Sequence, residues 1–163
     1  MLAVAKARLS TPDALSWLKK QIDNRIKPNG MMNLSGRNMP FNAFGHYTEM
    51  FAVSGAISEL LLQSVDGIIR VFPAWPKKKD AEFKDLRAQG GFLISAKQKD
   101  AEVTDFEVTS TVGGEFRFVS PWKKVQVKNQ SNGAALKTVT NKNGIAAFET
   151  KAGEKYLIIE IKE

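Results

Sequence analysis

The hydrophobic pattern of the chain changes from a helical to an alternating period at Asp66-Gly67. Upstream, apolar residues recur every three or four positions, as in Leu15, Leu18, Ile22 and Ile26. Downstream, short runs rich in β-branched and aromatic residues are separated by turn signals, among them Asn132-Gly133 and Asn143-Gly144, which mark hairpins. Helices followed by many short strands predict an α+β protein whose second part is an antiparallel β-sandwich.

This pattern predicts individual elements along the chain. Residues 2–9 are helix-prone, and a second helix is expected to begin with Thr11 as N-cap and Pro12 at the first helical position. A third helix is expected over 48–64. Strands are then expected over residues 68–72, 92–96, 103–111, 115–119, 123–128, 137–140, 145–150 and 156–161.

The expected helix over 48–64 is apolar on most of its sides. A helix of this kind is normally buried by neighbours on every side. Two further helices cannot provide that cover. We therefore expect either self-association through exposed helix faces or a larger helical assembly around this segment.

Composition excludes several classes of function. The chain has 163 residues, 43% of them hydrophobic, and a net charge of +7. The basic residues are scattered, with one run at Lys77-Lys78-Lys79, so nucleic-acid binding is not expected. No apolar run reaches membrane-spanning length. With no cysteine and one histidine, we expect no disulfide, no metal site and no cofactor, and no glycine-rich phosphate loop precedes a helix.

Two motifs resemble a known enzyme family. Aligned to end on Ser64, the segment over 48–64 is similar to D-G-N-F-G-G-T-A-G-I-A-E-M-L-L-Q-S, matching it at Phe51, Ile57, Glu59, Leu61, Leu62, Gln63 and Ser64. Downstream, residues 71–76 read VFPAWP, and residues 86–92 read LRAQGGF, close to L-R-A-R-G-G-F. Both motifs are found in glycoside hydrolase family 95, the α-L-fucosidase-type enzymes, near the end of a catalytic (α/α)6 barrel and the start of a C-terminal β-domain.

The resemblance implies a division of the chain and a role for it. Residues 1–66 would be the terminal helices and one active-site loop of a helical barrel, and residues 67–163 the C-terminal β-sandwich. The parent protein would be an inverting, periplasmic or extracellular hydrolase of α-L-fucoside or L-galactoside-type glycans. Its general-acid glutamate lies upstream in the family, so this chain would need the missing N-terminal part and would be inactive alone.

The family's catalytic aspartate falls on Thr48, whose hydroxyl cannot act as a base at neutral pH. Glu49 is then the candidate base, because the expected helix N-terminus favours a charged carboxylate there. Asn42, Phe44, His46 and Tyr47 are candidate contacts to the sugar substrate. Each has a structural alternative: a first-turn glutamate commonly serves only the helix dipole, and a single histidine is commonly a hydrogen-bonded loop residue.

Two other classes of function stay open. The chain could be a stand-alone, non-catalytic carbohydrate-binding or accessory β-sandwich module with a helical arm. It could also be a purely structural interaction protein, if it binds no sugar. The helix over 48–64 distinguishes a fragment from a complete module, because a fragment would leave one of its sides exposed and a complete module would bury it within one chain.

Overall fold

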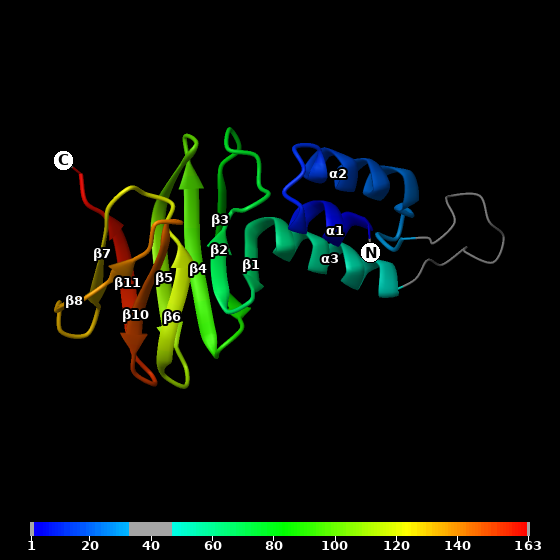
Figure 1. The fold of residues 1–163 in the computed structure, drawn as a ribbon. Coiled ribbons are helices and arrows are strands. Elements are labelled where there is room, and N and C mark those ends of the chain that lie inside the picture. The colour runs from blue at the N-terminus through cyan, green and yellow to red at the C-terminus, as the bar shows by residue number, and fades with distance from the viewer. Residues whose placement is uncertain (1, 33–46, 163) are drawn as a thin grey trace. The chain divides into compact units, whose positions relative to one another are not determined.

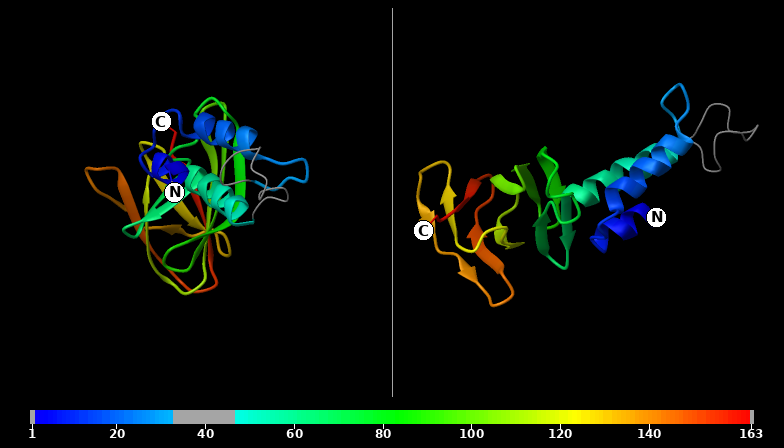
Figure 2. Two further views of the ribbon diagram at one scale, coloured as in Figure 1. Left: turned by 90° about the vertical axis from the view of Figure 1, so that its right-hand side faces the viewer. Right: turned by 90° about the horizontal axis from the view of Figure 1, so that it is seen from above.

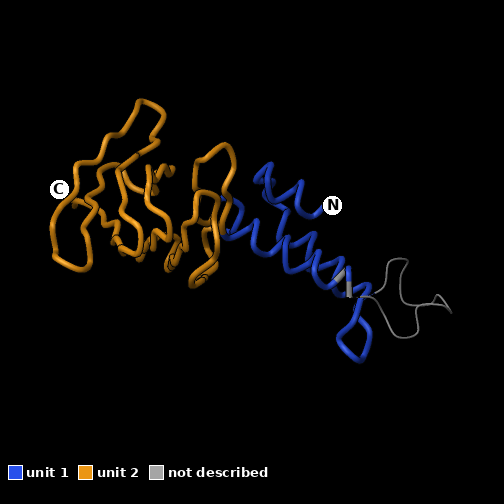
Figure 3. The backbone as a smooth tube through the Cα atoms, turned by 90° about the horizontal axis from the view of Figure 1, so that it is seen from below, with its two compact units in different colours: residues 1–61, 73–76 blue, residues 62–72, 77–163 orange. Residues whose placement is uncertain are grey.

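A computed structural model describes residues 2–32 and 47–162 of the chain, with the side chains of Tyr47 and Glu49 left aside. The chain divides into two compact units (Figure 3). We call Met1–Leu61 with Pro73–Pro76 the helical unit, and Leu62–Phe72 with Lys77–Glu163 the β unit. In the described residues, helices come first and strands follow (Figure 1), which confirms the predicted α+β class.

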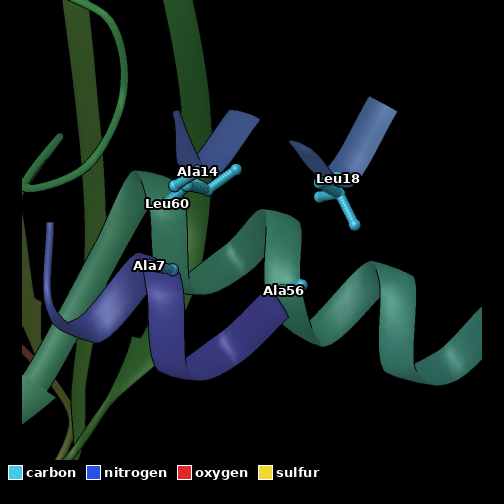
Figure 4. Close-up of a cluster of buried hydrophobic side chains, with 5 residues drawn as sticks. All are labelled: Ala7, Ala14, Leu18, Ala56 and Leu60. Carbon is cyan, nitrogen blue, oxygen red and sulfur yellow. The ribbon is translucent and has the colours of Figure 1, made fainter. Parts of the chain in front are cut away.

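The helical unit contains α1 (Leu2–Arg8), α2 (Ala14–Arg25) and α3 (Tyr47–Leu61). Its buried cluster is made of three alanines and two leucines that the three helices bring together (Figure 4): Ala7, Ala14, Leu18, Ala56 and Leu60. Alanines at the contact points let helix backbones approach closely, and the leucines fill the space between them. Trp75 packs against the same cluster, and the Ala74 amide donates to the Leu60 carbonyl at 3.4 Å.

The predicted start of the second helix is wrong by two residues. α2 begins at Ala14 with Asp13 as its N-cap residue, and no side chain caps it. The expected cap, the Thr11 hydroxyl, instead donates to the Lys6 carbonyl at 3.4 Å, and the Asp13 carboxylate accepts a hydrogen bond from the Lys6 ammonium at 2.6 Å. The contacts to the end of α1 therefore override the local capping preference.

The predicted end of the third helix is also wrong, because α3 ends at Leu61. Residues Leu62–Val65 form strand β1, which pairs antiparallel with β2 (Ile68–Val71). Asp66 and Gly67 make the two-residue connection, with φ of 54° and 68°. This is the backbone that Asp-Gly adopts readily in tight hairpins, so the hairpin prevails over the helical spacing of the preceding residues.

The β unit consists of two sheets, and its strands can be followed from two further sides in Figure 2. One sheet has the order β1-β2-β6-β10-β9 and the other has the order β3-β4-β5-β11-β7-β8. The remaining strands are β3 (Ala81–Ala88), β4 (Phe92–Lys99), β5 (Glu102–Ser110), β6 (Gly114–Val119), β7 (Val125–Asn129), β8 (Ala135–Leu136), β9 (Val139–Thr140), β10 (Ile145–Thr150) and β11 (Lys155–Glu160). Every named pairing is antiparallel except that of β2 with β6.

Alternate residues of these strands bury their side chains in an aromatic core. Phe116 is central: its ring lies 4.9 Å from Phe92, 5.6 Å from Phe118 and 5.5 Å from Phe148, measured between ring centroids. Tyr156 extends the cluster, 5.3 Å from Phe148. The Phe116–Phe118 pair is stacked and the other three pairs are tilted or edge-on, and such pairs add to the free energy gained by burying the rings. The predicted β-sandwich is therefore confirmed.

The strand predictions succeed where turn chemistry is local. Asn132-Gly133 connects β7 to β8 and Asn143-Gly144 connects β9 to β10, with positive φ at both glycines, as their hairpin signals predict. Strand β3 was not predicted, because a bulge between Phe83 and Leu86 breaks its alternation. The single strand expected over 137–140 is instead two short ones, β8 and β9, which belong to different sheets.

Tyr156 combines a buried ring with a fully used hydroxyl. The hydroxyl donates to Glu154 Oε2 at 2.7 Å and accepts the Lys151 amide at 2.7 Å. Asn129 Nδ2 donates to the same glutamate oxygen at 2.7 Å. Burial raises the pKa of the Tyr156 hydroxyl above its ordinary value of about 10. The folded state therefore favours the neutral phenol.

We expect Tyr156→Phe to change how stability depends on alkaline pH. At neutral pH the variant should lose about 1–3 kcal/mol, because the Lys151 amide loses its acceptor. Since the folded pKa is raised, native Tyr156 stabilises fully below about pH 10 and progressively less as pH rises from there to the folded pKa. Denaturation curves at neutral and alkaline pH should thus show the gap between the two proteins narrowing. Lysine titration is common to both proteins, so a constant gap would contradict this role.

Candidate functional site

The predicted catalytic positions fall at the start of α3. The structure places Tyr47, Thr48 and Glu49 in its first turn. The free amides at a helix start carry a partial positive charge that stabilises a nearby carboxylate. Thr48 is exposed, whereas the side chains of Tyr47 and Glu49 are outside the described part of the structure. The backbone thus brings these three predicted residues together on one helical turn.

The other predicted sugar contacts are Asn42, Phe44 and His46, and all three lie outside the described residues. Their proposed roles stay predictions. Among the described residues, no group of three or more histidine, cysteine, aspartate or glutamate side chains could hold a metal ion. Within the same residues, no helix has the length and hydropathy needed to cross a bilayer.

The outer side of α3 is apolar and exposed. Phe51 is 72% exposed and Ile57 is also exposed. No charged residue occurs between Glu49 and Glu59, although a solvent-facing helix side is normally charged. Gly55 lies in the middle of this helix, and nothing stands within 4 Å of the position that a Cβ atom would take there. A mid-helix glycine costs about 0.5–1 kcal/mol relative to alanine, so the described chain offers no packing reason for it.

The far end of α3 is held by an ion pair to α1. Arg8 Nη2 donates to Glu59 Oε1 at 2.8 Å and Arg8 Nε donates to Glu59 Oε2 at 3.2 Å. The Glu59 carboxylate raises the pKa of the Arg8 guanidinium through this hydrogen bond and its charge. A glutamate committed to a fork-like arginine pair is suited to orienting two helices rather than to acid–base chemistry.

A second feature is a hollow of about 330 Å³ in the β unit. We call it the β10 hollow. It lies over β6 and β10, beneath the segment that leads from β8 to β9, and its lining is mostly apolar with three charged residues: Glu115, Leu136, Lys137, Val139, Ala147, Phe148 and Glu149. The sequence signal for it is weak, because outward-facing positions of ordinary strands look the same.

The described chain thus has a helical unit followed by a two-sheet β unit, and the candidate base Glu49 lies in the first turn of α3. A family model described as glycoside hydrolase family 95, C-terminal domain, matches residues 63–158, which is more than half of the chain. The chain therefore belongs to this family and is a glycoside hydrolase-related protein. The matched range contains the LRAQGGF motif at residues 86–92, which pointed to the same family.

Other comparisons are less informative. Among solved structures, a family 39 glycoside hydrolase from the gut symbiont Bacteroides cellulosilyticus WH2 is similar at 19% identity, with a TM-score of 0.38. The similar region covers 54% of this chain and 18% of that one. A TM-score of this size does not establish a shared fold. No curated protein has significant sequence similarity to the chain.

Proposed function

We propose that this chain is the C-terminal part of an inverting glycoside hydrolase that acts on α-L-fucosides or related L-galactoside-type glycans in the periplasm or outside the cell. The observation that carries the proposal is the match of residues 63–158 to the C-terminal domain of family 95. The motif over 48–64 supports it, because it resembles the end of the catalytic barrel in that family.

The proposed chemistry divides between this chain and a preceding part of the parent protein. Inversion uses two carboxyl groups about 6.5–9.5 Å apart, with the attacking water held by the base. Glu49 would be the base, because Thr48 stands where the family has its aspartate and cannot take a proton from water at neutral pH. Tyr47 and the predicted contacts Asn42, Phe44 and His46 would orient the sugar. The general acid would come from the preceding part.

The outer side of α3 would be the surface onto which that preceding helical part packs. The uncharged face and the unexplained Gly55 both suit a close helix–helix contact, since a glycine lets another backbone approach. Phe51, 72% exposed, would fill a gap in the partner. In isolation the same face offers a site for self-association.

A stand-alone carbohydrate-binding module is the second candidate function. The aromatic core of the β unit favours it, because Phe106, Phe116 and Phe148 are buried within that unit alone. The exposure of Phe51 favours the fragment instead, because a complete module would cover this helix within one chain. Reading the coding DNA upstream of Met1 separates the two candidates: a continuous frame with helical barrel sequence and a glutamate acid supports the hydrolase, and a stop codon supports the module.

We expect the purified chain to give no turnover of an aryl α-L-fucoside, since in this proposal the general acid comes from the preceding part of the parent protein. The parent protein should hydrolyse the same substrate. In the parent, Glu49→Gln should lower kcat about 10²–10⁴-fold by removing the base. Glu102→Gln is the matched control, because Glu102 is an exposed strand residue of the β unit and its loss should leave kcat unchanged. Turnover by the chain alone, or full activity of the Glu49 variant, would refute this assignment.

A further inference from the structure

The β10 hollow has the size and lining of a small-ligand site. Its volume of about 330 Å³ lies at the lower end of the range for ligand pockets, about 300–1,000 Å³. It forms where residues 135–140 pass from the six-stranded sheet to the five-stranded one, so that Leu136 and Val139 stand beside the outer face of β10. Val139 is 62% exposed, which leaves apolar surface facing solvent at this place.

Two of the charged residues at the β10 hollow repel each other and so destabilise the sheet. Glu115 on β6 and Glu149 on β10 are directly opposite each other in the antiparallel register, and like charges at such positions are destabilising. Arg117 Nε lies 3.8 Å from Glu115 Oε2, and Lys137 also lines the hollow. Two carboxylates are thus balanced by two cations, and the surroundings as a whole are neutral.

This balance selects the kind of ligand. The positive charges of Arg117 and Lys137 beside the two carboxylates disfavour a metal ion, and an anion would meet both glutamates. A neutral molecule with many hydroxyl groups can instead donate hydrogen bonds to Glu115 and Glu149 and accept one from Lys137. Its C–H surface can lie on Ala147 and Val139. A pyranose ring has both kinds of surface.

We propose that the β10 hollow is a non-catalytic binding site for a single neutral sugar ring of a glycan. The apolar floor contacts the C–H face of the ring, and the two carboxylates accept hydrogen bonds from its hydroxyl groups. Binding reduces the repulsion between Glu115 and Glu149, because each carboxylate then accepts a hydrogen bond from a sugar hydroxyl. The proposal concerns binding by the β unit and does not depend on whether the parent protein hydrolyses fucosides.

Titration of the full ¹⁵N-labelled chain with L-fucose, D-galactose or D-glucose tests the proposal by amide chemical-shift changes. At least one sugar should give saturable shifts centred on Val139, Ala147 and Glu149, with a dissociation constant on the order of 1–10 mM. Ala147→Trp should abolish these shifts, because the indole would occupy the floor of the hollow. Glu149→Gln keeps the shape and should weaken binding about 10-fold by removing a charged acceptor.

Glu102→Gln serves as the control. Glu102 is an exposed glutamate on β5, which belongs to the six-stranded sheet and not to the sheet of Glu149, so this substitution should leave the affinity unchanged. The Glu149→Gln variant keeps the test decisive if Ala147→Trp does not fold. The proposal is overturned if none of the three sugars gives saturable shifts up to about 100 mM. Shifts centred on other strands, or an affinity insensitive to Glu149→Gln, would overturn it equally. No readout involves turnover, so failure here is distinguishable from failure of the hydrolase proposal.

Discussion

Phe116→Ala is expected to destabilise the β unit by about 3–5 kcal/mol. The ring is 0% exposed and lies within 6.4 Å of four other phenylalanine rings, measured between centroids. Its removal leaves a cavity between two sheets whose backbones are hydrogen-bonded and cannot close over it. Hydrogen exchange at the amides of β6 and β10 measures the opening free energy of this unit directly.

Phe51→Ala is the matched control for this experiment. It makes the same chemical change on a ring that is 72% exposed, so the isolated chain should change in stability by no more than about 0.5 kcal/mol. An equal loss in the two variants would mean that the aromatic cluster around Phe116 does not form the core of the β unit.

Leu60→Ala should have the second largest effect, with a loss of about 2–5 kcal/mol confined to the helical unit. Leu60 is 1% exposed and belongs to the five-residue cluster shared by α1, α2 and α3. Apart from Leu18, the remaining members of the cluster are three alanines. They offer little apolar surface to replace the contacts that Leu60 makes. Protection against hydrogen exchange should be lost in α1 and α2 and retained in β11.

Leu9→Ala provides the comparison, because it removes the same side-chain atoms from a residue that is 77% exposed and lies outside the cluster. Its exchange protection should match that of the unmodified chain within about 0.5 kcal/mol. If Leu60→Ala behaves like Leu9→Ala, the cluster is not what holds the three helices together.

Local signals were enough to predict much of this fold. The hairpins at Asn132-Gly133 and Asn143-Gly144 follow from turn chemistry, because each glycine adopts a positive φ that other residues disfavour. Alternation of apolar and polar residues predicted β10 over Ile145–Thr150 without error. These features depend on residues within a few positions of each other, so a single sequence contains the information.

Other elements depend on residues far apart in the chain and could not be read locally. Leu62–Val65 continues the apolar helical spacing of α3. It nevertheless forms a strand, because it pairs with Ile68–Val71. The capping role expected of Thr11 is lost to a contact with Lys6. In β3, the bulge next to Asp85, where φ is 52°, interrupts the alternation and conceals the strand.

The candidate sites divide in the same way. The resemblance at residues 48–64 and 86–92 identified the family from the residues alone, because such motifs are contiguous, and the role of Glu49 as base stays a prediction. The β10 hollow is different. Glu115 and Glu149 become neighbours through strand register, and Lys137 joins them because β8 and β9 belong to different sheets. Register and sheet membership are set by burial of the opposite strand faces, and burial is a property of the folded chain as a whole.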